Sequence, residues 1–233
     1  LLTLPTEKLI MRKILTLFLT LSFLTGIYTL ALGGGLDNTD SRYPSRQYRR
    51  FLLPNQMKVM LISDPTLQRG AASLTVGVGS MSDPAERFGL AHFLEHMLFL
   101  GTEKYPDEGS YQKFVSTHDG FSNAYTADDR TNYHFEIDPE YLEEALDRFS
   151  QFFLAPLFNP DLVEREKKAV EAEHSKNIPN DSRRIFQVKR KAFEEGHPAR
   201  HFATGTMETL DGVSRKELLG FYRKYYSSNQ MML

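Results

Sequence analysis

The sequence of 233 residues contains no cysteine. This absence excludes disulfide bonds, zinc sites built from thiolates and enzymes that use a cysteine nucleophile. The chain also lacks an excess of charge of one sign, because 28 basic and 30 acidic residues give a net charge of −2. Without a basic stripe, nucleic-acid binding is a poor hypothesis. Any metal ion must therefore be held by histidine, aspartate or glutamate.

The rest of the composition is that of an ordinary globular protein, with 41% apolar and 25% charged residues. The chain is long enough for one domain with a sizeable core. It shows no internal repeat and no low-complexity tract. We expect this domain to occupy residues 47–233.

The first part of the chain has a different character. Residues 11–33 begin with Met-Arg-Lys, continue as an apolar run and end in small residues, which is the pattern of a signal peptide. We expect residues 1–10 to be a non-native upstream extension and the polar residues 34–46 to be a linker. The pattern predicts export, in a bacterium to the periplasm. The alternative is a membrane anchor that is not cleaved, because about 18 apolar residues approach the length that spans a bilayer.

The order of predicted elements indicates the fold class. Short alternating runs predict strands at 47–53, 57–63, 72–79, 121–127 and 132–138, and Met231-Met232-Leu233 resembles the start of another. Apolar spacing and capping residues predict helices at 88–100, 107–117, 139–154 and 160–178, one from the cap Asp181 to about 196–198, and one at 214–226. Strands followed by helices, without strict alternation, predict an α+β domain.

The predicted helix 88–100 carries three titratable side chains, His92, Glu95 and His96, among apolar residues. Their spacing of i, i+3 and i+4 places them on one face of the helix. Two imidazoles one turn apart can bind one cation, and the carboxylate can accept a proton from water. This is the inverted form of the His-Glu-x-x-His zinc motif. The alternative is two core histidines bonded to the backbone, but three buried polar groups are costly unless something satisfies them.

A catalytic zinc site commonly has three protein ligands and one open position. The third ligand is expected on the predicted helix 160–178, which carries four glutamates. Glu166 and Glu173 lie two turns apart on a face that is otherwise small and apolar, so we expect both to point inward. Glu164 and Glu171 lie off that face and are expected to meet solvent. Spacing alone does not decide between Glu166 and Glu173.

Two segments resemble the pitrilysin and insulin-degrading-enzyme (insulinase) family of inverted-motif zinc metallopeptidases. They are His-Phe-Leu-Glu-His-Met-Leu-Phe-Leu-Gly-Thr at 92–102 and Glu-Lys-Lys-Ala-Val-Glu-Ala-Glu-His at 166–174. Further matches lie at 121–126, 131–133 and 225–229, so that the likeness covers nearly all of 47–233. It is closer to the insulin-degrading-enzyme and pitrilysin branch than to the mitochondrial processing peptidases. The resemblance implies a mostly antiparallel sheet packed by helices, as the N-terminal domain of a larger, multi-domain peptidase that is truncated here.

The resemblance also implies roles for individual residues. One Zn²⁺ per domain would be held by His92, His96 and Glu173. Glu95 would be the general base that accepts a proton from zinc-activated water. Glu166 would support the ligands from outside the metal's own coordination shell.

The substrates implied by the resemblance are short unfolded peptides, cleaved by a zinc metalloendopeptidase. The alternating strand 121–127 would pair with the substrate backbone through Asn123 and Ala124, and main-chain bonding of this kind accepts many sequences. The family closes its chamber with a second half that supplies an arginine and a tyrosine. We therefore expect the partners to be peptides and the missing C-terminal half, with no nucleic acid and, after signal removal, no membrane. The chain alone is expected to bind zinc but to be nearly inactive.

Two other functions are compatible with the same fold. A non-catalytic scaffold or partner subunit would commonly have lost motif residues, whereas His92, Glu95, His96 and Glu173 are all present. A purely structural metal site needs neither an adjacent base nor an open coordination position. The presence of Glu95 therefore favours catalysis over both alternatives.

Overall fold

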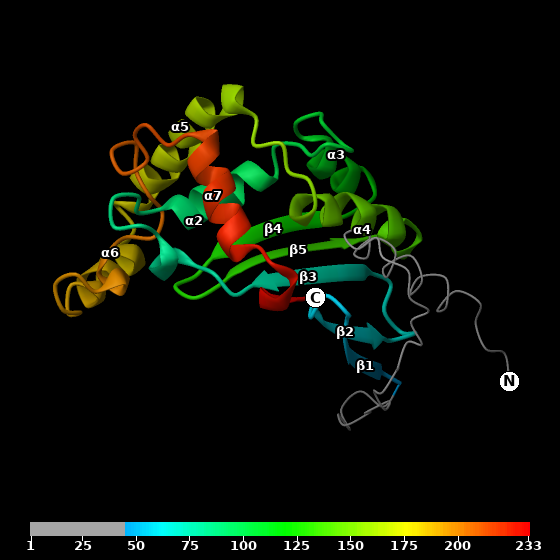
Figure 1. Ribbon diagram of the computed structural model, residues 1–233. Helices are drawn as coiled ribbons and strands as arrows, with labels where there is room; N and C mark the ends of the chain where they lie inside the picture. Colours follow the sequence, from blue (N-terminus) through cyan, green and yellow to red (C-terminus); the bar gives the residue numbers. More distant parts are fainter. Residues whose placement is uncertain (1–44) are drawn as a thin grey trace, which may run out of the picture.

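The computed structural model describes residues 45–233, which Figure 1 shows in colour. The predicted upstream extension, the predicted signal peptide and all but the end of the predicted linker lie outside these residues. Within residues 45–233, no helix combines the length and the apolar character needed to cross a bilayer.

One mixed sheet organises the described part of the chain (Figure 1). Its strands are β1 (Gln47–Leu52), β2 (Lys58–Ser63), β3 (Gly70–Val76), β4 (Phe121–Thr126), β5 (Thr131–Ile137) and β6 (Met231–Met232). The order across the sheet is β1-β2-β6-β3-β5-β4, and only the β2–β6 pair is parallel. The predicted fold class is therefore confirmed: this is an α+β domain with a mostly antiparallel sheet.

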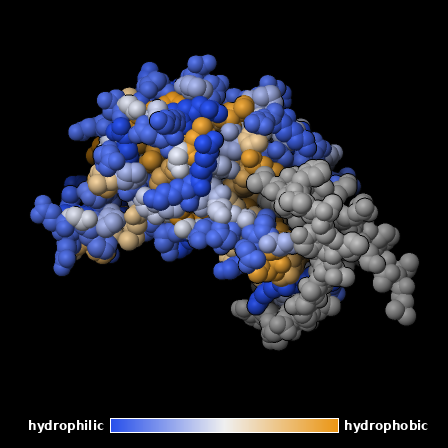
Figure 2. All heavy atoms as spheres, viewed as in Figure 1, coloured by the Kyte–Doolittle hydropathy of each residue, from blue (hydrophilic) through white to orange (hydrophobic). Residues whose placement is uncertain are grey.

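Most of the helices gather on one side of the sheet, and α6 lies beyond the ends of the strands (Figure 1). They are α2 (Leu90–Leu98), α3 (Ser110–Thr117), α4 (Leu142–Ser150), α5 (Pro160–Asn177), α6 (Asp181–Arg190) and α7 (Arg215–Tyr225). Because side chains of a strand alternate between faces, β5 directs Tyr133, Phe135 and Ile137 into the core beneath the helices. The outer surface of the domain is mostly hydrophilic in the face that Figure 2 shows, with apolar groups between the helices.

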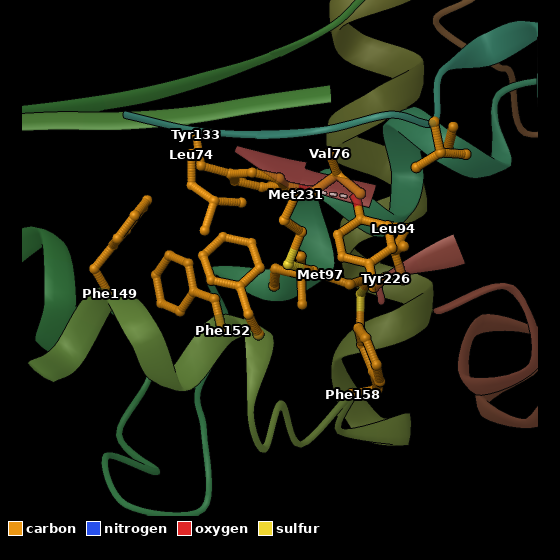
Figure 3. Packing of buried hydrophobic residues seen from close by; sticks show 14 of the residues in the cluster. Leu74, Val76, Leu94, Met97, Tyr133, Phe149, Phe152, Phe158, Tyr226 and Met231 are labelled. Atoms are coloured by element: carbon orange, nitrogen blue, oxygen red, sulfur yellow. Dashed lines mark hydrogen bonds between the residues drawn. The ribbon is translucent and has the colours of Figure 1, made fainter. Parts of the chain in front are cut away.

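The core joins the sheet to α2. Figure 3 shows Leu74 and Val76 of β3 packed with Leu94 and Met97 of α2, and aromatic side chains from α4 and its extension fill the space beside them. Leu74, Val76, Leu94 and Met97 are fully buried. At about 25 cal/mol per Å² of buried apolar surface, such a core is the main term that stabilises the domain and fixes the position of α2.

Side-chain caps set the helix starts as the sequence predicts, with one exception. The Asp138 and Asn159 side chains accept backbone N–H groups at the starts of the next helical segments, and Ser214 forms a capping box at α7. The cap of α6 is Asn180, not Asp181 as predicted from the sequence. Asp181 is instead the first helical residue, where its negative charge faces the positive end of the helix dipole.

Two predicted element ends are also wrong. Helix α6 ends at Arg190 and not near 196–198, because the chain after it folds back so that the Ala199 carbonyl oxygen accepts a hydrogen bond from the Arg190 side chain. Helix α2 ends at Leu98, and the residue that closes it is Phe99. Gly101, the residue directly after the predicted helix 88–100, adopts positive φ two residues beyond Phe99, where a Cβ atom would lie 2.7 Å from the Pro106 carbonyl oxygen.

Candidate metal centre

Helix α2 is buried in the domain and carries the predicted motif. Five of its apolar side chains, those of Ala91, Phe93, Leu94, Met97 and Leu98, are fully buried, whereas His92 and His96 are partly exposed on the remaining face. The helix therefore has one polar stripe inside an otherwise apolar environment, as predicted. The hydrophobic residues hold the helix in place, and the polar stripe opens toward α5.

The start of α2 is fixed by an aspartate that the sequence analysis did not identify. The Asp83 carboxylate accepts hydrogen bonds from the backbone N–H groups of Gly89, at 2.7 Å, and Ala91, at 2.8 Å. These are groups that a helix leaves without intrahelical partners at its first turn. A cap seven residues before the first residue of the helix cannot be recognised from local spacing, because its loop has to fold back.

A close glycine contact fixes the same end of α2. Gly89 has φ of 94°, and a Cβ atom there would lie 2.2 Å from the Cα of Gly205. Only glycine therefore fits at this point, for both the conformation and the space. The contact brings the segment around Thr204 against the first turn of α2.

Three ligand atoms converge between α2 and α5. The Nε2 atoms of His92 and His96 are 3.3 Å apart. The Oε2 atom of Glu173 lies 3.4 Å from Nε2 of His92 and 3.6 Å from Nε2 of His96. Ligands at about 2.0–2.2 Å in a tetrahedral zinc site lie roughly 3.3–3.6 Å from one another. Among the described residues, this is the one group of three that could hold a metal ion.

The outer nitrogens of both rings are already engaged. Nδ1 of His92 donates a hydrogen bond to the Thr204 carbonyl oxygen at 2.8 Å, since a carbonyl oxygen can only accept. Nδ1 of His96 lies 2.8 Å from Oε1 of Glu166, again an acceptor. In neutral rings both Nε2 atoms therefore present lone pairs toward each other and toward Glu173. Three facing acceptors repel unless a proton or a cation lies between them, so the donor set fits a zinc ion.

The electrostatics of the site also favour a positive charge between the three side chains. Burial alone would lower the pKa of His96, but its hydrogen bonds with Glu166 and Glu173 outweigh burial and raise the pKa to about 9. Hydrogen bonds from His92 and His96 hold the pKa of Glu173 well below its usual range. A positive charge is thus strongly favoured at this point, supplied by a proton or by a metal ion that displaces it.

The two candidate glutamates occupy different places. Glu173 reaches both Nε2 atoms, whereas Glu166 contacts the far nitrogen of His96. Spacing alone left these two open, and the geometry makes Glu173 the candidate ligand and Glu166 the candidate for orienting the His96 ring. Glu164 is exposed as predicted. Glu171 was expected to meet solvent but is partly buried, and accepts a hydrogen bond from the Met207 backbone N–H at 2.7 Å.

Glu95 lies on the same face of α2 and is 7% exposed. Its Oε2 accepts a hydrogen bond from the hydroxyl of Thr126, the last residue of β4. Burial raises the pKa of Glu95, and the nearby His92 partly offsets this. With a cation bound at the three converging ligand atoms, a buried carboxylate with one oxygen held by a hydroxyl would be suited to accept a proton. The sequence analysis did not identify a role for Thr126, because a single hydroxyl side chain forms no recognisable sequence motif.

Strand β4 forms the edge of the sheet next to the motif helix. On one side it pairs with β5, where Asn123 faces His134 and Ala124 faces Tyr133. On its other side no strand of the described residues pairs with it. The alternation predicted for this strand is observed, because Phe121, Asn123 and Tyr125 are exposed and the residues between them are half-buried. The backbone of β4 is thus available to another strand.

Four further histidines of the described residues lie outside this group and have other partners. His118 and His134 bond to a backbone carbonyl and to a neighbouring amide on their own elements. His197 caps a short 3₁₀ helix, and the ring of His201 stacks on Phe88.

Comparisons with known proteins agree with this geometry. The family model described as "Insulinase (Peptidase family M16)" matches residues 58–203. Human insulin-degrading enzyme is 50% identical over 200 residues, which are 83% of this chain and 20% of the relative. The Arabidopsis thaliana protein "Insulin-degrading enzyme-like 1, peroxisomal" is 48% identical over 207 residues, 86% of this chain and 21% of the relative. The crystal structure of pitrilysin matches with a TM-score of 0.78 and 37% identity, covering 84% of this chain and 21% of that chain.

The chain spans about a fifth of the length of these relatives. The residues that the family model matches include both histidines of the site, His92 and His96. They also include Glu95, Glu166 and Glu173. The resemblance stated from the two motif segments is therefore confirmed across most of the described domain, and the chain belongs to the insulinase family, peptidase family M16.

Proposed function

We propose that this chain is the zinc-binding catalytic domain of a metalloendopeptidase that hydrolyses short unfolded peptides. The observation that carries the proposal is the convergence of two Nε2 atoms and one carboxylate oxygen beside the buried Glu95. His92, His96 and Glu173 would hold one zinc ion. Bound there, zinc would supply a Lewis acid that polarises the scissile carbonyl and lowers the pKa of water.

The chain's own residues would transfer the proton and set the histidine tautomers. Thr126 occupies Oε2 of Glu95, which leaves Oε1 to accept a proton from the attacking water and to pass it to the leaving amine. Glu166 would keep His96 in the tautomer that presents Nε2. Thr204 would do the same for His92 through its carbonyl oxygen.

The open edge of β4 supports peptides as substrates. An extended substrate can add to this edge as a further strand, through the backbone of Asn123 and Ala124, and such binding depends little on side chains. The relatives' names support the same class, since Insulin-degrading enzyme and A-factor-processing enzyme name proteins that act on insulin and on A-factor. Because these relatives are about five times longer, we propose that full activity also needs groups from outside residues 45–233.

The test is zinc content and hydrolysis of a quenched fluorescent peptide by the complete protein and by Glu95→Gln. The variant is expected to keep one zinc ion per chain and to lose turnover by at least about a thousandfold, since it keeps the ligands but not the base. Loss of zinc in Glu95→Gln would show that Glu95 is a ligand. A wild-type protein that binds zinc without hydrolysing any peptide would favour the non-catalytic scaffold.

Two further proposals concern the chain as a whole. Purified residues 45–233 are expected to bind zinc and to show nearly no peptidase activity, and full activity of this piece would contradict that.

The proposal of export rests on the pattern of residues 11–33 alone. N-terminal sequencing of the mature protein tests it, and a mature chain that retains residues 11–33 would favour the membrane anchor or no export.

A further inference from the structure

Arg190, the last residue of α6, is buried although it carries a charge. Its Nη1 donates hydrogen bonds to the carbonyl oxygens of Ala199, at 2.7 Å, and His201, at 3.0 Å. Its Nη2 bonds the carboxylate of Asp128, and the guanidinium lies 4.8 Å from the ring centre of Phe186. A planar guanidinium can hold several acceptors in fixed directions at once, which a lysine cannot do.

The first branch of these contacts leads to His92. Ala199 and His201 lie in a segment, residues 198–205, that has one short 3₁₀ turn and otherwise no regular structure. The His201 ring stacks on Phe88 at 3.5 Å, and three residues later the Thr204 carbonyl oxygen accepts the Nδ1 hydrogen of His92. Because no helix or sheet ladder fixes this segment, its position depends on the approach of Gly205 to Gly89 at one end and on side-chain contacts such as those of Arg190 at the other.

The second branch leads to Glu95. Asp128 lies in the turn between β4 and β5, two residues after Thr126, whose hydroxyl bonds Glu95. The same turn is also bound by Ser80, whose backbone N–H donates to the Ala127 carbonyl oxygen at 2.9 Å and whose hydroxyl lies 3.4 Å from the Asp128 carboxylate. One guanidinium therefore contacts two separate segments. One segment hydrogen-bonds the His92 side chain of the motif helix, and the other hydrogen-bonds the Glu95 side chain.

We propose that Arg190 is a positioning residue for the metal centre: its contacts fix residues 198–204 and the β4–β5 turn, and through them the ring of His92 and the carboxylate of Glu95. The proposal rests on the proposed function, in which the site binds zinc. Without an acceptor at Nδ1, the His92 ring can rotate or exchange its tautomer, and Nε2 then carries the hydrogen and cannot bind a metal.

Removal of Arg190 would loosen these segments without burying an unpaired charge. The side chain of Asp128 is 43% exposed, so water can solvate the carboxylate once the arginine is gone. The carbonyl groups of Ala199 and His201 would lose their shared donor. The effect expected is therefore a misplaced Thr204 and not a general loss of the core.

The test is Arg190→Met in the complete protein, with Zn²⁺ affinity measured by competition with a chelating dye and ligand geometry measured by the visible absorption of the Co²⁺-loaded protein. Contacts that orient zinc ligands are commonly worth 10- to 100-fold in metal affinity. We expect zinc binding about tenfold weaker and an altered Co²⁺ spectrum. The matched control is Arg184→Met on the same helix, whose partner Asp181 is exposed, and it should behave as the wild type.

A folded Arg190→Met protein with wild-type zinc affinity and a wild-type Co²⁺ spectrum would overturn the proposal. If that variant does not fold, Arg190→Lys tests the proposal, because lysine keeps the positive charge but lacks the planar guanidinium that binds several acceptors at once. We expect about threefold weaker zinc binding for Arg190→Lys, and unchanged binding would again overturn the proposal. A wild-type protein that binds no zinc would instead refute the proposed function, so the two failures are distinguishable.

Discussion

The hydroxyl group of Thr126 donates a hydrogen bond to Oε2 of Glu95 and so joins the end of strand β4 to the motif helix α2. The strand proposed to bind the substrate backbone and the residue proposed to accept the proton are thereby fixed relative to each other. Under the proposed function, this one side-chain contact would align the reacting peptide bond with the base.

Substitution of Thr126 tests this alignment. Thr126→Val keeps the shape of the side chain and removes the donor, and a hydrogen bond to a charged group contributes about 1.5–3 kcal/mol. We predict kcat lower by at least about tenfold, with KM changed by less than about twofold. Steady-state kinetics on a quenched peptide measure both. Thr126→Ser should restore kcat, and equal losses in the serine and valine variants would argue against this role.

Glu173 and Glu166 are predicted to differ in their effect on zinc binding. Glu173→Gln removes a ligand and should weaken Zn²⁺ binding by more than about 100-fold, whereas Glu166→Gln, which acts through His96, should cost about 10- to 100-fold. Isothermal titration of the metal-free proteins measures both. Glu164→Gln, on the same helix but exposed, is the control. A larger loss for Glu166→Gln than for Glu173→Gln would reverse the assigned roles.

The metal-free protein should lose stability as the pH rises through about 9. Without metal, the pKa of His96 is raised from 6.5 in the unfolded chain to about 9 in the folded protein, against the effect of burial, by Glu166 and Glu173. The folded state therefore binds the proton more tightly, and the resulting stabilisation is complete below pH 6.5 and is lost between pH 6.5 and 9. Thermal unfolding in EDTA from pH 6 to pH 10 measures it. The His96→Gln protein should lack this component, and the same pH profile in both proteins would contradict the assignment.

The contact of Gly89 with Gly205 should be sensitive to a single methyl group. Both Gly89 and Gly109 precede a helix with positive φ, but a Cβ atom on Gly109 meets nothing within 4 Å. Gly109→Ala should therefore cost only the backbone strain, about 1–2 kcal/mol. Gly89→Ala adds a clash and should cost clearly more, on the order of 4 kcal/mol. Urea unfolding of the two variants gives the difference, and similar losses would show that the contact is loose.

Much of this domain can be predicted from local sequence patterns. The motif helix, the long helix α5 and the strands β1, β2, β4 and β5 follow from apolar spacing and from caps such as Asn159 and Ser214, which act within four residues. The candidate metal ligands of α2 follow from the i, i+4 spacing of His92 and His96. The choice of Glu173 over Glu166 needed either the resemblance or the fold.

The supporting contacts could not be predicted, for physical reasons. Asp83 caps α2 across a loop, and Thr204 acts through its backbone carbonyl oxygen, which every residue possesses. Glu171 differs from the prediction because the Met207 backbone N–H donates to its carboxylate, and no helical pattern indicates where a distant loop returns. The early end of α6 has the same origin, since Arg190 binds the loop that follows it.

The central claim is that two imidazoles and the Glu173 carboxylate bind one metal ion, and a crystal of the zinc-loaded protein tests it most directly. Anomalous scattering at the zinc edge should give one peak within about 2.2 Å of Nε2 of His92, Nε2 of His96 and a carboxylate oxygen of Glu173. A zinc-loaded crystal with no peak between these three side chains, or with a peak at Glu166 in place of Glu173, would contradict the account.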